Sequence, residues 1–128
     1  MTIENLEAYV DSLPDWAILD GCFGNTMIKP SDIDGVIERN GNCLFLEHKR
    51  RGVPLKEGQR RLFQALARQG NTVIVYWESD DVITRIVLMT CNGVETRGPA
   101  ESSLEIRRSI GEWWFAQANH PRRTWRTD

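Results

Sequence analysis

The feature that most constrains the fold is a strand, a helix and a second strand that follow one another between residues 43 and 77. Residues 72–77 are almost continuously apolar, which is typical of a strand buried in the middle of a sheet. The helix predicted over residues 55–69 has apolar side chains at helical spacing and ends at Gly70. A helix of this length between two strands is the layout of a right-handed crossover, so residues 43–49 and 72–77 are expected to be parallel neighbours.

A hairpin is predicted just before this unit. Residues 32–38 form a β-branched run, Asn40-Gly41-Asn42 follows, and residues 43–49 form the return strand. Asn-Gly between two such runs is a strong signal for a tight turn, so the two strands are expected to pair antiparallel. The other predicted elements are a helix over residues 2–13, a possible strand near 26–29, a strand over 83–89 and a helix over 101–117.

Together these elements predict one α/β domain over residues 1–128, with a central mixed sheet flanked by helices. The expected order of its core, residues 1–78, is α-β-β-β-α-β, and residues 79–128 add a strand, a helix and a basic tail. No run approaches the roughly 18 apolar residues of a membrane span, and the N-terminus lacks the layout of a signal peptide, so a cytoplasmic protein without a membrane partner is expected. The three cysteines are too scattered to indicate a disulfide framework or a zinc site.

The charge is distributed unevenly along the chain. Residues 1–47 contain nine acidic and two basic side chains, whereas residues 48–128 contain fourteen basic and nine acidic ones. An acidic half followed by a basic half suits a metal site beside a phosphate-binding surface, although solvated surface charge would explain the same asymmetry.

The predicted hairpin brings charged groups together on one face. Side chains alternate along a strand, so Glu47 and Lys49 share a face and His48 points the other way. If the hairpin pairs as described, Asp34 approaches Glu47, and two close carboxylates attract a divalent cation such as Mg²⁺ or Mn²⁺. With the backbone carbonyl of His48 as a further ligand, such an ion would promote phosphodiester hydrolysis, assisted by Lys49. The following segment would hold phosphates through Arg50, Arg51, Lys56, Arg60 and Arg61.

These residues resemble the signature of the PD-(D/E)XK nuclease superfamily. The resemblance rests on the runs Pro30-Ser31-Asp32-Ile33-Asp34 and Leu44-Phe45-Leu46-Glu47-His48-Lys49 and covers about residues 1–78. Within the superfamily the chain is most similar to the compact Holliday junction resolvases and the virus-type replication-repair nucleases. The resemblance implies a restriction-endonuclease-like core, a catalytic role for Gln59 at the start of the crossover helix, and a metal-assisting Glu4 or Glu7 on the first helix.

Some assignments stay open at this point. The metal ligand is either Asp32 or Asp34, which are expected on the same strand face; Asp34 is favoured because it lies further into the strand and its separation from Glu47 fits a tight hairpin. Glu47 and Lys49 would be a solvated pair if their strand lay at an edge, and His48 is expected to be a packed or surface residue rather than a catalytic base. Arg122 and Arg123 either bind phosphates or belong to a disordered tail.

The sequence therefore predicts a Mg²⁺- or Mn²⁺-dependent DNA endonuclease that prefers branched or Holliday junction DNA. Cutting two strands symmetrically would require a homodimer, and Trp113 or Trp114 is expected in the core or at the dimer interface rather than stacked on bases. The alternative is a nuclease-like fold that only binds DNA or assembles with partners. Nothing in the sequence excludes an RNA substrate.

Overall fold

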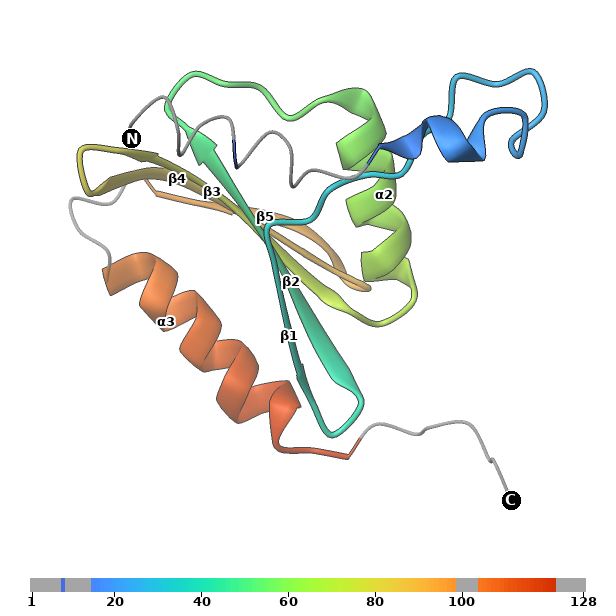
Figure 1. Cartoon of the computed structure of the whole chain (residues 1–128). Helices are drawn as coiled ribbons and strands as arrows, with labels where there is room; N and C mark the ends of the chain where they lie inside the picture. The colour runs from blue at the N-terminus through green and yellow to red at the C-terminus, as the bar shows by residue number, and fades with distance from the viewer. Residues whose placement is uncertain (1–7, 9–14, 99–103, 122–128) are drawn as a thin grey trace. The chain divides into compact units, whose positions relative to one another are not determined.

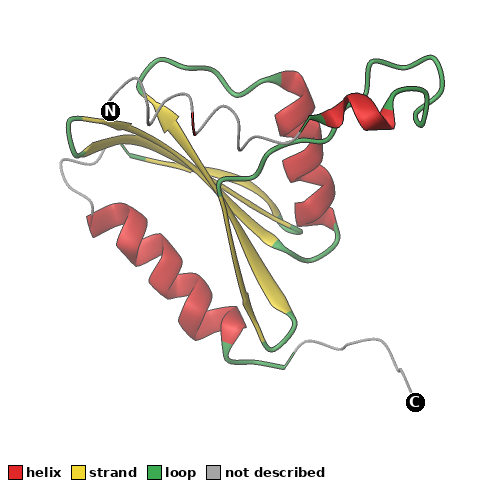
Figure 2. Ribbon diagram, in the orientation of Figure 1, coloured by secondary structure: helices red, strands yellow, loops and turns green. Residues whose placement is uncertain are grey.

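The computed structural model describes Ala8, residues 15–98 and residues 104–121. The chain divides into two compact units, Met1–Asp32 and Ile33–Asp128. The second unit holds a five-stranded mixed sheet with helices on both of its faces (Figure 1; Figure 2), which confirms the predicted α/β class and flanked sheet. In chain order its elements are β1 (Gly35–Arg39), β2 (Asn42–Arg50), α2 (Glu57–Arg68), β3 (Thr72–Ser79), β4 (Val82–Thr90), β5 (Gly93–Arg97) and α3 (Leu104–Trp113), which continues into a π-helical turn, Trp114–Ala118.

The predicted hairpin is confirmed. Strands β1 and β2 pair antiparallel with Gly35 opposite Leu46 and Arg39 opposite Asn42. Asn40 and Gly41 make the connection with φ values of 54° and 83°, as a two-residue turn with left-handed residues requires. Strand β1 begins only at Gly35, so the expectation that Asp32 and Asp34 share a strand face is wrong; Asp34 lies immediately before the strand.

The crossover is also confirmed. Helix α2 connects β2 to β3, and these two strands are parallel neighbours. The sheet order is β1-β2-β3-β4-β5, which puts β2 and β3 inside the sheet rather than at an edge. The solvated edge-strand explanation for Glu47 and Lys49 is therefore wrong. A register shift at Trp77/Glu78 interrupts the pairing of β3 with β4.

The two faces of the sheet carry separate apolar cores. On one face α2 packs on β3 and β4, with Phe63 and Ala67 buried against Val73, Val75, Trp77, Val87 and Met89. On the other face α3 and the π-helical turn cover Leu44, Ile74, Ile83 and Ile86 with Ile106, Trp113 and Ala118. Trp113 is thus a core residue, as predicted, whereas Trp114 is partly exposed.

The C-terminal elements extend the sheet beyond the prediction. Strand β5 pairs antiparallel with β4 and was not predicted, because only Val94 in it is apolar. The hairpin is hydrogen-bonded to the end of the π-helical turn. The side-chain amide of Asn42 donates to the backbone carbonyls of Gln117 (2.8 Å) and His120 (2.7 Å). No helix among the described residues is long and apolar enough to cross a membrane.

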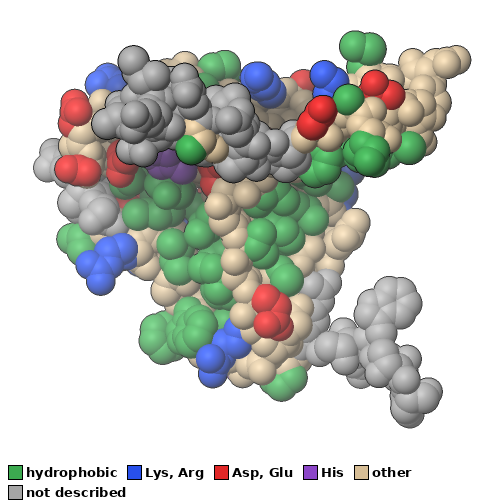
Figure 3. All heavy atoms as spheres, in the orientation of Figure 1, with side chains coloured by type: hydrophobic (Ala, Val, Ile, Leu, Met, Phe, Trp, Pro, Cys, Tyr) green, Lys and Arg blue, Asp and Glu red, His purple; other side chains and the backbone are tan. Residues whose placement is uncertain are grey.

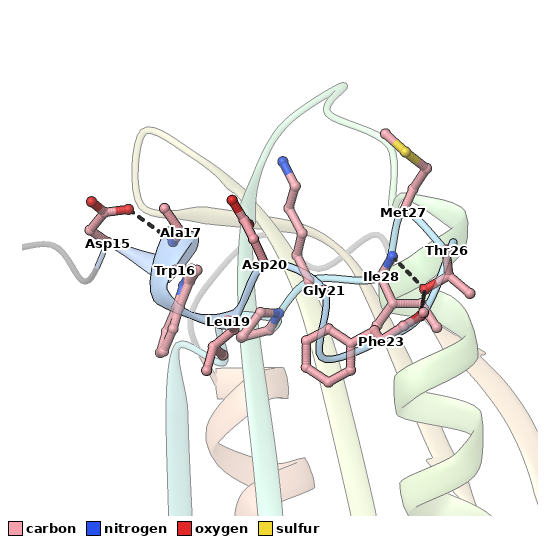
Figure 4. Close-up of a pocket in the computed structure, with 13 residues that line it drawn as sticks. Asp15, Trp16, Ala17, Leu19, Asp20, Gly21, Phe23, Thr26, Met27 and Ile28 are labelled. Atoms are coloured by element: carbon pink, nitrogen blue, oxygen red, sulfur yellow. Dashed lines mark hydrogen bonds between the residues drawn. The ribbon is translucent and has the colours of Figure 1, made fainter.

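The first unit is described from Asp15 onward, apart from Ala8. A 3₁₀ turn, Trp16–Leu19, begins where the Asp15 carboxylate accepts the Ala17 N–H at 2.9 Å (Figure 4), and a hollow lies among residues 15–30. The strand predicted near 26–29 is absent from these residues, since Thr26 turns the chain by donating to the Phe23 carbonyl at 2.7 Å. Two strands rather than three therefore precede α2 in the described chain, which corrects the expected order. The helix predicted over 2–13 lies outside the described residues apart from Ala8.

Candidate active site

Asp34 and Glu47 meet at the start of the hairpin. Since Gly35 lies opposite Leu46, the same antiparallel register sets Asp34 opposite Glu47. The Asp34 carboxylate is held there by the backbone N–H of His48, which donates to Oδ2 at 2.8 Å. The preference for Asp34 over Asp32 gains support, because Asp34 accepts the N–H of the residue after Glu47 and its charge acts on Glu47.

Glu47 is a buried carboxylate with an unpartnered oxygen. The residue is only 5% exposed, and its strand lies inside the sheet between β1 and β3. Its Oε1 accepts a long hydrogen bond from Gln59 Nε2 at 3.4 Å, while Oε2 is buried and has no hydrogen-bond partner. A buried acceptor without a partner costs free energy, and more so when it is charged. Burial raises the pKa of Glu47 to about 7, together with the negative charge of Asp34 and a hydrogen bond that the protonated carboxyl makes to Asp34, although Lys49 and Gln59 lower it.

Lys49 and Gln59 complete the cluster. Lys49 lies on the same face as Glu47, and its Nζ is 3.8 Å from Glu47 Oε1. The ammonium donates to Gln59 Oε1 at 2.8 Å, while the amide nitrogen of Gln59 points to Glu47. Gln59 comes from the first turn of α2, so the crossover helix delivers the group that joins the two strand residues. The structure thus brings Asp34, Glu47 and Lys49 together, as the hairpin predicted, and it places Gln59 beside them.

His48 contacts the cluster through its backbone N–H and not through its ring. The ring lies on the opposite face of the sheet, edge-on to Tyr76 with ring centroids 5.1 Å apart. Its Nε2 is 3.2 Å from the Glu78 carboxylate. This placement agrees with the prediction that the His48 side chain is packed or exposed rather than a base of the site.

The carboxylates fit a hard divalent cation only in part. Glu47 Oε2 is an orphaned oxygen beside a second carboxylate, and oxygen donors are the ligands that Mg²⁺ and Mn²⁺ prefer. Among the described residues, however, no three His, Cys, Asp or Glu side chains are grouped so that they could hold a metal ion. The further acids, Glu4 and Glu7, lie outside the described residues, and Asp32 belongs to the first unit.

The predicted phosphate-binding side chains are spread over the end of β2 and the start of α2. Arg50, Arg51 and Lys56 are exposed. Arg60 and Arg61 already pair with Glu57 on their own helix, at 2.6 Å and 3.2 Å. The hydrogen bond from Arg60 lowers the pKa of Glu57, so this acid competes with a phosphate for both arginines. Arg122 and Arg123 lie outside the described residues.

A hollow beside the cluster was not predicted. It has a volume of about 750 Å³ on the α2 face, and Trp77 of β3 and Arg85 of β4 line it. The signal in the sequence was Arg85, the one charged residue in the run Ile83–Met89. The chain matched no protein-family model, no curated protein and no solved structure, so the site is interpreted from its own geometry.

Proposed function

We propose that this chain is a divalent-metal-dependent DNA endonuclease of the PD-(D/E)XK type. The observation that carries the proposal is that the buried carboxylate of Glu47 has one oxygen without a hydrogen-bond partner. This carboxylate lies close to Asp34, and Gln59 joins it to Lys49. A protein gains no stability from burying such a group alone. A bound cation would satisfy its free oxygen and relieve the repulsion between the two carboxylates.

In this proposal Asp34, Glu47 and the His48 carbonyl would hold Mg²⁺ or Mn²⁺, which supplies Lewis-acid polarisation of the phosphate and an acidified water. Lys49 would present its ammonium to the negative charge that develops on the phosphate oxygens. The Lys49 side chain is only 12% exposed, so water screens this interaction weakly. Gln59 is a positioning residue, because its carbonyl holds the ammonium at 2.8 Å.

The proposed substrate is branched DNA, including Holliday junctions. Its support is the exposed basic segment that follows Lys49, since Arg50, Arg51 and Lys56 are free to reach backbone phosphates next to the reacting group. Contacts of this kind position a nucleic acid but do not read its sequence, so selectivity would come from the shape of the DNA.

The test is a cleavage assay on fluorescently labelled four-way junction, flap, blunt duplex and single-stranded DNA. Each substrate is incubated with Mg²⁺, with Mn²⁺ and with EDTA, and a matched single-stranded RNA is included. We expect metal-dependent cleavage that is fastest on branched DNA. Absence of metal-dependent cleavage on every substrate would refute it, and faster cutting of the RNA would replace DNA as the substrate.

One observation favours a second candidate, a nuclease-like fold that binds DNA without cutting it. The described residues supply two carboxylates to the cluster and no group of three metal-binding side chains. If Glu4 and Glu7 do not join the site, a cation would rest on two carboxylates and a carbonyl. Metal-independent binding of branched DNA in the same panel, without cuts, would establish this candidate.

We also propose that the chain acts as a homodimer. Hydrophobic side chains gather where β1 and β2 lie in the view of Figure 3, and the edge strand β1 exposes Val36 (53%) and Ile37 (37%). The π-helical turn adds Phe115, which is 77% exposed, and Trp114, whose ring lies 4.6 Å from the Arg39 guanidinium carbon. Sedimentation should give twice the monomer mass for the wild type and monomer mass for Phe115→Asp; a monomeric wild type refutes the dimer.

A further inference from the structure

We infer that the hollow beside the candidate active site binds one unpaired nucleotide of the DNA strand that is cut. This inference rests on the proposed function, because it takes a DNA strand as the ligand. The hollow lies entirely within the second unit, and its volume of about 750 Å³ falls within the range of about 300–1,000 Å³ that is usual for small-molecule sites.

The position of the hollow follows from strand register. Lys49 on β2 pairs with Trp77 on β3, and Trp77 pairs with Arg85 on β4. Because neighbouring strands are about 4.8 Å apart, the backbone of Arg85 is about 10 Å from that of Lys49. These three residues form one row across the sheet on the α2 face, so the hollow at Trp77 and Arg85 lies one to two strand spacings from Lys49, within reach of a nucleotide next to the reacting phosphate.

The lining of the hollow combines an apolar floor with a cationic rim. The floor consists of the apolar side chains of Val53, Val87, Met89 and Val94. Two of them are exposed to solvent although they are apolar, Val53 by 43% and Val94 by 59%. Such a floor suits the flat, weakly polar face of a nucleobase, and this face is accessible only when the base is unpaired.

Arginine side chains at the rim suit the phosphate of the same nucleotide. The Arg85 guanidinium carbon lies 4.9 Å from the centre of the Trp77 ring, and stacking on an indole leaves the hydrogen-bonding edge of a guanidinium available. The Trp77 N–H donates to the Val53 carbonyl at 2.6 Å, which ties the loop that carries Arg51 to the floor. In the described part of the chain no carboxylate pairs with Arg51 or Arg85, whereas Glu57 engages Arg60. A nucleotide therefore matches both the shape and the charge of the hollow.

The inference is tested by binding in EDTA, where no cleavage takes place. Fluorescence anisotropy is measured on a labelled single-stranded oligonucleotide, on the same oligonucleotide with abasic sites, and on a blunt duplex. The matched variants are Arg85→Ala and Arg107→Ala, because Arg107 is an exposed arginine of α3, which packs on the opposite face of the sheet. Circular dichroism and urea unfolding are recorded for each variant to show that it is folded.

We expect Arg85→Ala to weaken single-strand binding about tenfold and to lower the slope of log K against log salt by about one, while Arg107→Ala changes affinity less than twofold. Abasic sites should weaken binding to the wild type about fivefold or more, as loss of one base contact does. Equal effects of the two variants, or no effect of abasic sites, would overturn the inference.

The cleavage assay separates this outcome from failure of the proposed function. If the protein shows metal-dependent cleavage but the two variants weaken DNA binding equally, only nucleotide binding in the hollow is refuted, and the nuclease proposal is unaffected. Selective loss of binding in Arg85→Ala without any cleavage refutes the nuclease proposal and supports the hollow as a site for single-stranded DNA.

Discussion

The Glu47→Gln substitution should stabilise the protein at high pH and remove its response to metal. The pKa of Glu47 is raised from the ordinary value of 4.5 to about 7 by burial and the charge of Asp34. A group with a raised pKa in the folded state favours folding below its unfolded pKa, and this contribution is lost as pH rises from 4.5 to 7. The wild type should therefore lose stability over this window, whereas the variant has no such group to ionise.

The size of the effect follows from the pKa. A rise from 4.5 to about 7 corresponds to at most about 3 kcal/mol of unfolding free energy. Solvent screening at the open side of the site, where Asp34 is exposed, reduces this to about 1–2 kcal/mol. We expect Glu47→Gln and wild type to be equally stable near pH 4.5 and the variant to be about 1–2 kcal/mol more stable at pH 8.

The assay is urea unfolding in EDTA at a series of pH values, followed by tryptophan fluorescence. A matched control is Glu105→Gln, which removes a carboxylate of a surface ion pair on α3 and should shift stability by less than about 0.5 kcal/mol at every pH. Repeating the series with Mg²⁺ or Mn²⁺ should reverse the order: a metal at 100 times its Kd stabilises wild type by about 2.7 kcal/mol and leaves Glu47→Gln unchanged. An equal pH dependence of the two proteins would refute the account of Glu47, and an equal metal response would refute the metal site.

Three further substitutions test other parts of the structure. Gln59→Ala removes the hydrogen bond to Lys49 Nζ and should lower kcat about tenfold with KM unchanged, whereas a KM effect alone would assign Gln59 to substrate binding. His48→Ala should keep cleavage within about threefold of wild type in a single-turnover assay, because only the backbone of His48 faces the site; a hundredfold loss would make the ring a participant. Gly41→Val should lower the free energy of unfolding by about 1–2 kcal/mol in urea titrations, since φ of 83° strains a β-branched residue; an unchanged midpoint would contradict the turn geometry.

Patterns that act over a short stretch of chain were predictable from the sequence. Asn40-Gly41 has a strong preference for one turn type, and that turn fixes the register that sets Asp34 opposite Glu47. The alternation along β2 likewise separates Glu47 and Lys49 from His48. These constraints act between residues close in the sequence, so the sequence alone predicts that Asp34, Glu47 and Lys49 lie together.

Features that depend on distant packing were not predictable. Strand β5 exists because it pairs with β4, although Val94 is its only apolar residue. In the described chain the possible strand near 26–29 has no neighbour to pair with, and Thr26 lies in a bend there and donates to the Phe23 carbonyl. The hollow joins a loop, a helix and three neighbouring strands, and no spacing along the chain reveals that Trp77 and Arg85 stack.

The most direct test of the central claim compares wild type with Lys49→Ala for Mn²⁺-dependent cleavage of labelled branched DNA. The account predicts that the variant loses at least a hundredfold in cleavage rate, as loss of one charge-stabilising group typically causes. It also predicts that the variant keeps its fold, its DNA binding in EDTA and its stabilisation by Mn²⁺. A Lys49→Ala protein that folds and cleaves at the wild-type rate would contradict the proposed mechanism.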